Sequence, residues 1–346
     1  MNRLYCERVE RIIRFCEMLT VPDGMLVGQR VKLEPEQKRF INAVYGPRTK
    51  DGARIVSQAL LTMARKNAKT ALIAMLVLVH LCGPEAIRNG EIYSVAFDRE
   101  QAAQVFKYAS AMIYASDFLS RRLNVVETKK QISDPGSGSR YTALSAESRT
   151  KHGKSSAVVI FDELAQFGQD RRLYDVMTTS TAAHDAPLIF YISTQAENDA
   201  ALFSELVDYG KKVNAGEIDD PSFVAFIYEV PPEADPWDER NWYLANPFLG
   251  IFKNLEVMRR DAHRARTMPG AEAAFRNLHL NQRVASDAAF IPVDVWKRNG
   301  AQPDEDLFES GCPCWAGLDL SAKNDLTAAV FVCMDDAYFS SLNMLK

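Results

Sequence analysis

The pattern of hydrophobic and polar positions predicts two helices at the start of the chain. In residues 3–20, apolar side chains recur at near-helical spacing among Arg and Glu residues, which is typical of an amphipathic helix. The turn-forming residues 21–24 then break this pattern. A second helix is expected to begin near Pro35 and to end at Gly46-Pro47.

Strand-like and helix-like segments alternate between residues 53 and 230. We expect strands at 53–63, 91–97, 140–146, 156–161, 187–194 and 222–230, and helices at 69–82, 99–116, 171–183 and 199–216. The Gly- and Ser-containing stretch 132–140 is expected to be a turn between strands. Several of the strands are continuously apolar, so the pattern predicts a parallel α/β sheet covered by helices on both faces.

The pattern changes after residue 230. Residues 254–285 are helix-like and basic, with a break at 268–270, and a sheet pattern returns at 314–321 and 326–334. We therefore expect four parts. They are an N-terminal helical extension (1–30), an α/β domain (31–230), a helical linker subdomain (231–305) and the start of a second sheet (306–346).

Composition narrows the class of protein. With 41 Lys and Arg against 45 Asp and Glu, the net charge is −4, which excludes a strongly basic coat for nucleic acid. The longest apolar run, 71–82, is too short to cross a membrane, and the charged N-terminus does not resemble a signal peptide. The six cysteines form no C-x-x-C pair and the five histidines have no metal-ligand spacing. We expect an intracellular protein with reduced thiols and without a membrane partner.

The first strand-to-helix junction, 61–72, has features of a phosphate-binding loop. Lys69 is placed to reach the β- and γ-phosphates, and the Thr70 hydroxyl is placed to ligate Mg²⁺. The glycines usual in such a loop are replaced by Met63 and Ala68. A Lys-Thr pair at a helix start is also common as ordinary capping. Whether this segment is a phosphate-binding loop therefore depends on the surrounding sequence.

An acidic pair ends a later apolar strand. Asp162 and Glu163 follow a β-branched run, at the end of the strand where α/β sheets hold their ligands. Asp162 is a candidate for holding Mg²⁺ through water, and Glu163 for polarising the water that attacks the γ-phosphate. A strand that ends in two solvated acids is the alternative. The combination with the Lys69 loop favours an ATPase.

Two shorter motifs are in register with this interpretation. Before the first strand, L-E-P-E-Q at 33–37 places Gln37 as a candidate reader of the adenine edge. Another apolar strand ends in Ser193-Thr194-Gln195. These polar residues are candidates for contacting both the γ-phosphate and a moving domain, which would couple hydrolysis to motion.

Together these motifs resemble the large terminase subunit of tailed bacteriophages, in the branch typical of HK97-like phages. The resemblance rests on an ordered set that covers most of residues 30–325: L-E-P-E-Q, A-R-K-N-A-K-T (64–70), V-V-I-F-D-E-L (158–164), I-S-T-Q (192–195), W-Y-L-A-N-P-F-L-G (242–250), L-H-L-N-Q-R-V (278–284) and G-L-D-L-S (317–321). It departs from the family at Ala68, where Gly is usual.

The resemblance implies an ATP-driven motor that moves double-stranded viral DNA into a procapsid. It implies a P-loop NTPase fold of the RecA-like (ASCE) type, a helical linker and an RNase H-like nuclease. ATP and Mg²⁺ would be bound by Gln37, Lys66, Asn67, Ala68, Lys69 and Thr70. The implied partners are the portal protein, the small terminase subunit and further copies in a ring, in the cytoplasm of the bacterial host.

Families of this kind also use an arginine to neutralise the transition state. Arg65, in the loop itself, is the candidate within the same subunit. Arg149 is the candidate supplied to a neighbouring subunit, and Lys151 ranks second.

Asp319 is the candidate for the nuclease site. It lies within an apolar strand beside Leu318, where a buried carboxylate is costly unless it binds a ligand. Two-metal nucleases hold Mg²⁺ or Mn²⁺ with several such carboxylates. Only Asp325 and the pair Asp335-Asp336 lie near it, so we expect the nuclease to be incomplete and without activity within these 346 residues.

Two other functions remain open at this point. A superfamily 2 helicase also carries L-x-P-x-Q and Asp-Glu motifs, but it needs a second nucleotide-fold domain, which residues 231–346 do not indicate. A degenerate prophage relic that binds nucleotide without turnover is favoured slightly by the missing glycines.

Overall fold

The computed structural model describes residues 5–145, 155–284, 311, 313–319 and 328–333. They belong to two compact units, Met1–Asp287 and Ala288–Lys346, which are described separately.

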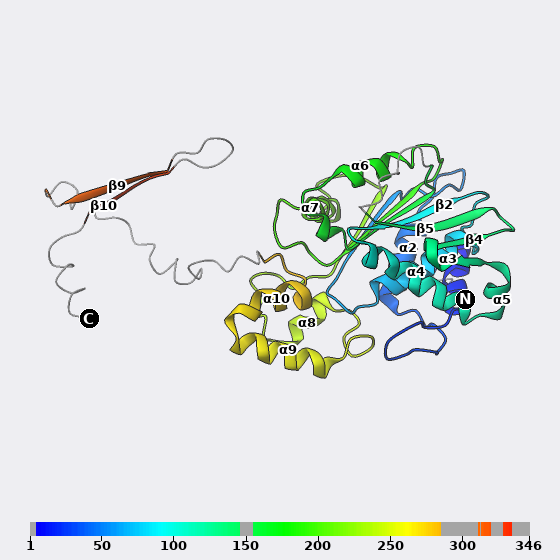
Figure 1. The fold of residues 1–346 in the computed structure, drawn as a ribbon, viewed down its shortest axis with the longest axis horizontal. Helices are drawn as coiled ribbons and strands as arrows, with labels where there is room; N and C mark the ends of the chain where they lie inside the picture. Colours follow the sequence, from blue (N-terminus) through cyan, green and yellow to red (C-terminus); the bar gives the residue numbers. More distant parts are fainter. Residues whose placement is uncertain (1–4, 146–154, 285–310, 312, 320–327, 334–346) are drawn as a thin grey trace. The chain divides into compact units, whose positions relative to one another are not determined.

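An eight-stranded sheet forms the centre of the first unit (Figure 1). Its strand order is β3-β4-β5-β2-β6-β7-β1-β8. The strands are β1 (Gln58–Thr62), β2 (Glu91–Ala96), β3 (Asn124–Val126), β4 (Gln131–Asp134), β5 (Ser139–Ser145), β6 (Val158–Asp162), β7 (Leu188–Ser193) and β8 (Phe223–Ile227).

Six neighbouring strands run parallel, as the continuous apolar runs predict; in spatial order they are β5, β2, β6, β7, β1 and β8. Strands β3 and β4 add an antiparallel edge. The prediction of one long turn at 132–140 was wrong in part, because Ile132 to Asp134 belong to β4. The turn itself is short: Asp134 accepts hydrogen bonds from the Gly136 amide and the Ser137 hydroxyl. Local hydrogen bonds of this kind close a hairpin tightly.

Helices cover both faces of the sheet, as predicted (Figure 1). One face carries α1 (Glu7–Glu17), α2 (Pro35–Tyr45), α3 (Lys69–Leu81), α4 (Arg99–Tyr114) and α5 (Asp117–Arg122). The other carries α6 (Arg172–Thr179), α7 (Leu202–Asn214) and the 3₁₀ turn η2 (Leu164–Phe167). A second 3₁₀ turn, η1 (Glu127–Lys129), follows β3. The pattern did not predict the short elements α5 and β3.

Helix α3 lies at the centre of the first face. It is apolar all round and buried along almost its whole length, because α1 and α4 also pack on it. The N-terminal helix α1 contributes Val9 and Ile12 to the same core, and Arg8 pairs with buried Glu85 just beyond α3. The helix that carries Lys69 is therefore rigidly embedded.

Residues 231–284, here called the helical subdomain, contain α8 (Glu239–Ala245), α9 (Leu255–Thr267) and α10 (Pro269–Leu280). The predicted break at 268–270 is confirmed, with Pro269 in the first turn of α10. Helix α8 was not predicted. These helices share an apolar core that also includes Ala64, from the loop after β1. The subdomain thus packs against the loop that follows β1.

In the second unit, the two predicted strands form an antiparallel pair, β9 (Cys314–Asp319) and β10 (Ala328–Cys333), with Asp319 opposite Ala328. The expectation of a buried strand was wrong for Leu318, which is 66% exposed. The side chain of Asp319 lies outside what the structure describes, as do Asp325, Asp335 and Asp336. Across the described residues, none of the helices has the length and apolar character that crossing a membrane requires.

Candidate active site

The strand order places the predicted motifs at one edge of the sheet. Strand β7 lies between β1 and β6, and all three are parallel, so their carboxyl ends meet. The register pairs Thr62 with Ser193 and Asp162 with Ile192. The loop after β1, the acidic pair after β6 and the polar triplet after β7 therefore converge.

The loop between β1 and α3 has the left-handed turns of a phosphate-binding loop without its glycines. Lys66 has φ of 66° and Ala68 has φ of 56°. A left-handed non-glycine residue costs on the order of 1–2 kcal/mol, so this loop needs support from its surroundings. The departure at Ala68 therefore falls at a position where glycine would relieve strain.

Lys69 begins α3 and points back into the loop. Its Nζ donates to the carbonyl oxygens of Met63 at 2.7 Å and Ala64 at 3.2 Å, and the residue is 6% exposed. Burial lowers the pKa of Lys69, while the carboxylates of Glu163 and Asp162 oppose that shift. The loop carbonyls hold the ammonium group where an anionic ligand could replace them.

The acidic pair differs in environment. Asp162 is buried, and burial together with the neighbouring Glu163 raises its pKa to about 7. A divalent cation would relieve the cost of its charge, and Thr70 lines the same cavity. Among the described residues, no group of three His, Cys, Asp or Glu side chains could hold a metal ion. The Asp162 carboxylate and the Thr70 hydroxyl nevertheless fit Mg²⁺, because this ion usually keeps several waters and takes one or two protein ligands beside phosphate oxygens.

Glu163 is fixed by the strand next to it. Its backbone is left-handed, with φ of 51°. Its Oε2 accepts a hydrogen bond from the Ser193 hydroxyl at 3.1 Å and lies 3.5 Å from the Thr194 amide nitrogen. Two members of the predicted coupling triplet therefore contact the predicted water-polarising carboxylate directly.

Gln195, the third member, turns toward the helical subdomain. Its backbone amide donates to Asn281 at 2.8 Å, and its carbonyl accepts from Asn277. Its side chain donates to Glu229 and accepts from Arg283. One short segment thus connects Glu163 to the helical subdomain.

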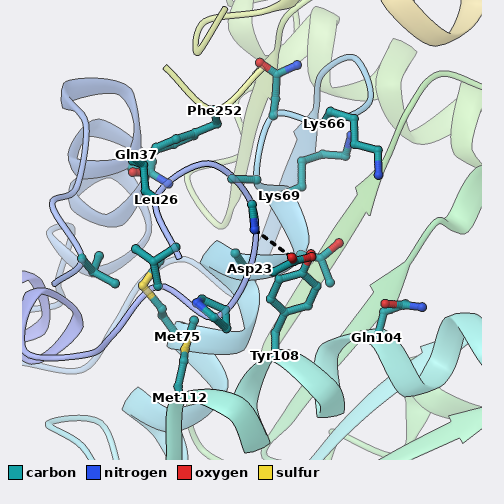
Figure 2. Close-up of a pocket in the computed structure, with 18 of the residues that line it drawn as sticks. Asp23, Leu26, Gln37, Lys66, Lys69, Met75, Gln104, Tyr108, Met112 and Phe252 are labelled. Carbon is teal, nitrogen blue, oxygen red and sulfur yellow. Dashed lines mark hydrogen bonds between the residues drawn. The ribbon is translucent and has the colours of Figure 1, made fainter. Parts of the chain in front are cut away.

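A cavity of about 620 Å³ opens in front of Lys69, Asp162 and Glu163 (Figure 2). It extends from the loop at 65–70 to the N-terminal segment 21–32. Sequence reasoning missed much of its wall, which includes Asp23, Leu26, Met75, Tyr108, Met112 and Phe252. The Tyr108 hydroxyl donates to Asp23 at 3.3 Å, which joins α4 to the N-terminal segment. These residues share no local motif, so only the fold brings them together.

Gln37 also lines this cavity, although it lies far from the loop at 65–70 in the sequence. Its Oε1 accepts from the Glu34 backbone amide at 3.0 Å, as the N3 residue of a capping box. This bond orients the amide group, so that the Nε2 donor is the end available to a ligand. Gln37 therefore stays the predicted contact of a base, and it lines the cavity.

A second cavity of about 300 Å³ lies between the sheet edge and the helical subdomain. Its wall includes Thr194, Gln195 and Asn277. Arg65 is exposed and lines both cavities. Its role as a cation beside the γ-phosphate stays a prediction.

Arg149 and Lys151 lie in 146–154, outside the described residues. Asp319 belongs to the second unit.

The parallel sheet, the Lys-Thr loop after β1 and the acidic pair two strands away define a P-loop ATPase fold. Two family models match the chain: "Terminase large subunit, ATPase domain" at residues 35–212, just over half of the chain, and "Terminase large subunit, endonuclease domain" at residues 217–345. The chain belongs to the terminase large subunit family, as the motifs predicted.

Similar proteins agree with this assignment. The terminase large subunit of Enterobacteria phage HK97 is 43% identical over 325 residues, which is 93% of this chain and 62% of that protein. That of Lactococcus phage p2 is 23% identical and covers 96% of this chain and 62% of its own length. The chain thus spans less than two thirds of these relatives.

Solved structures give the same fold. The crystal structure of the HK97 bacteriophage large terminase has a TM-score of 0.73 and 42% identity, covering 95% of this chain and 65% of that one. The ATPase domain of the Thermus phage P74-26 large terminase has a TM-score of 0.51 at 16% identity, covering 73% of this chain and 94% of that one, and shows the fold alone.

Proposed function

We propose that this chain hydrolyses ATP with Mg²⁺ and uses the energy to move double-stranded viral DNA into a procapsid. The observation that carries the proposal is the contact of Glu163 with Ser193 and Thr194, at the edge of the sheet where Lys69 and Asp162 also lie. A water-polarising carboxylate is thereby fixed beside a phosphate-binding loop.

Hydrolysis of a phosphoanhydride depends mainly on positioning and on neutralising charge. Lys69 would exchange its bonds to the loop carbonyls for phosphate oxygens, while Arg65 and Lys66 supply further positive charge. Thr70, and Asp162 through water, would hold Mg²⁺, which would neutralise part of the phosphate charge. Glu163 orients the attacking water and accepts its proton.

Motion would be transmitted through the segment 193–195. A change at the γ-phosphate that shifts Glu163 also shifts Ser193, and Gln195 is bonded to Asn281 and Asn277 of the helical subdomain. This arrangement supports the proposed coupling of hydrolysis to domain movement.

We also propose the four-part division at residues 30, 230 and 305, with an RNase H-like nuclease segment that begins at 306. Asp319 would be one ligand of its Mg²⁺ or Mn²⁺ ions. The match of the endonuclease model to 217–345 supports a nuclease segment and includes the helical subdomain.

The family supports phage packaging proteins as partners. We propose the portal protein, the small terminase subunit and further copies of this chain in a ring around DNA, in the host cytoplasm. Arg149 of one copy would then reach the γ-phosphate bound by the next. No observation favours a helicase, and residues 231–284 are helical where a helicase needs a second sheet.

The experiment is steady-state release of phosphate from ATP by the purified chain, with Mg²⁺, with and without linear duplex DNA. We expect hydrolysis that duplex DNA stimulates and that Lys69→Ala abolishes. If the chain binds ATP but does not hydrolyse it either with or without duplex DNA, it is instead a relic that has lost turnover.

A further inference from the structure

The phosphate-binding loop contacts the helical subdomain directly through its backbone. The Ala64 amide donates to the Ala245 carbonyl at 3.1 Å, and the Arg65 amide donates to the Leu278 carbonyl at 3.0 Å. Ala64 also belongs to the apolar core of the subdomain. The first half of the loop is therefore anchored outside the sheet that it belongs to.

Asn67 anchors the second half. It lies between the two left-handed residues, Lys66 and Ala68, and is 1% exposed. Its Nδ2 donates to Asn246 Oδ1 at 2.9 Å, and its Oδ1 accepts from the Phe248 amide at 3.3 Å. The side chain of Asn67 is thus held at both ends by the segment after α8.

Asn246 is itself fully buried and fixed. Its Nδ2 donates to the carbonyl oxygens of Trp242 and His279, both at 2.8 Å. Its Oδ1 accepts a second hydrogen bond, from Lys253 Nζ at 2.8 Å. Because every polar atom of this amide is paired, it cannot rotate away from Asn67 without leaving buried groups unsatisfied.

We propose that Asn246 and Lys253 are positioning residues that hold the glycine-free loop in its phosphate-binding shape. In a glycine loop the left-handed turns form without strain, so the sheet and α3 suffice. Here Ala68 is strained, and the contacts of Asn67 with the helical subdomain stabilise the strained form. The affinity of the loop for nucleoside triphosphate therefore depends on docking of the helical subdomain.

This dependence has a mechanical consequence. Movement of the helical subdomain away from the sheet would break the bond of Asn246 to Asn67 and let the loop relax. The grip on phosphate would then weaken. This second connection is independent of the one through Gln195.

The inference rests on the proposed nucleotide binding, and its test is a double-mutant cycle in the full chain. The probe is ATP with Mg²⁺, measured by displacement of a fluorescent ATP analogue, and folding is checked by circular dichroism. The variants are Asn246→Ala, Ala68→Gly and the two combined, with Lys69→Ala as the variant that tests nucleotide binding itself. Asn241→Ala, in helix α8 shortly before Asn246, is the matched control for the asparagine. Lys130→Gly, which removes a left-handed non-glycine residue elsewhere, is the matched control for the glycine.

We expect Asn246→Ala to weaken ATP binding by about tenfold, and the added Ala68→Gly to restore most of that loss. The two controls should leave binding unchanged, and Lys130→Gly should not rescue Asn246→Ala. If Asn246→Ala does not fold, Lys253→Met takes its place, with a weaker loss of about threefold and the same rescue by Ala68→Gly.

Two results would overturn the inference while leaving the proposed function intact. One is a folded Asn246→Ala chain that binds ATP like the parent. The other is a loss of binding that Ala68→Gly fails to restore. A parent chain whose ATP binding is absent or insensitive to Lys69→Ala would instead refute the proposed function, and the inference with it.

Discussion

The hydroxyl of Ser193 donates a 3.1 Å hydrogen bond to Oε2 of Glu163, across two adjacent parallel strands. Glu163 is the first residue after β6 and Ser193 the last residue of β7. The orientation of the carboxylate is therefore set by a residue of the strand that also leads to the helical subdomain through Gln195.

Loss of this bond should affect turnover rather than binding. We expect Ser193→Ala to lower kcat for ATP hydrolysis by about tenfold or more, with KM for ATP little changed, because the misplaced carboxylate matters mainly in the transition state. Steady-state phosphate release is the measurement, and Ser110→Ala, at another buried serine, is the control. An unchanged kcat would show that Glu163 is held sufficiently by other groups.

The role of Gln37 is separable from its role as a helix cap. In Gln37→Glu, a carboxylate oxygen can still accept from the Glu34 amide, but the Nε2 donor is lost. We expect the capping bond to persist, thermal stability to fall because a carboxylate replaces a buried amide, and the preference for ATP over GTP to fall by about tenfold, since a base edge loses its partner. Competition binding with both nucleotides measures this. If Gln37→Glu keeps the preference of the parent, another group reads the base.

Supply of an arginine by a neighbouring copy predicts rescue in mixtures. Inactive Arg149→Ala and inactive Glu163→Gln chains should regain part of the ATPase activity when mixed, because some interfaces then combine an intact Glu163 with an intact Arg149. The parent activity should also rise more steeply than linearly with protein concentration. Lys151→Ala mixed with Glu163→Gln tests the second-ranked candidate in the same way. Absence of rescue at all mixing ratios, with assembly shown by sedimentation, would exclude Arg149.

Lys253 predicts a pH dependence of stability. Burial and the charge of Lys69 lower the pKa of Lys253 from 10.5 to about 7, against the opposing charge of Asp261. Between these two pKa values the unfolded chain binds the proton and the folded chain does not, so stability rises with pH across this window. Below pH 7 the folded chain carries the charged, buried Lys253 ammonium group, which lowers its stability.

The matched variant is Lys253→Met, which keeps most of the length of the side chain and removes the ammonium group. We expect the parent to gain on the order of a few kcal/mol in unfolding free energy relative to this variant between pH 7 and pH 9.5. Urea unfolding at both pH values measures the difference. Parallel pH curves for the two chains would show that Lys253 keeps its ordinary pKa.

Sequence patterns were sufficient for the main elements of the first unit. The apolar run of α3 and the β-branched run of β6 are both buried. Helix α3 begins at Lys69, and strand β6 ends at Asp162. Residues close in sequence to a strand end are placed by the strand, so their convergence follows from a parallel sheet.

The remaining features depend on long-range packing. Tyr108 and Asp23 face the same cavity because α4 packs beside the N-terminal segment, and no periodicity encodes that contact. The motif at 242–250 could be seen as a resemblance, but the support that Asn246 gives to Asn67 depends on a contact between residues 179 apart in sequence. The short strand β4 was missed because its four residues, Gln131–Asp134, lead directly into a turn.

The most direct test of the account is a comparison of ATP binding and ATP hydrolysis in Glu163→Gln, with the parent chain measured in parallel. We predict that the variant binds ATP with Mg²⁺ as tightly as the parent and loses hydrolysis by at least about a hundredfold, because only orientation and proton acceptance at the attacking water are removed. Hydrolysis by Glu163→Gln at the rate of the parent would contradict the assignment of this site as the centre of ATP turnover.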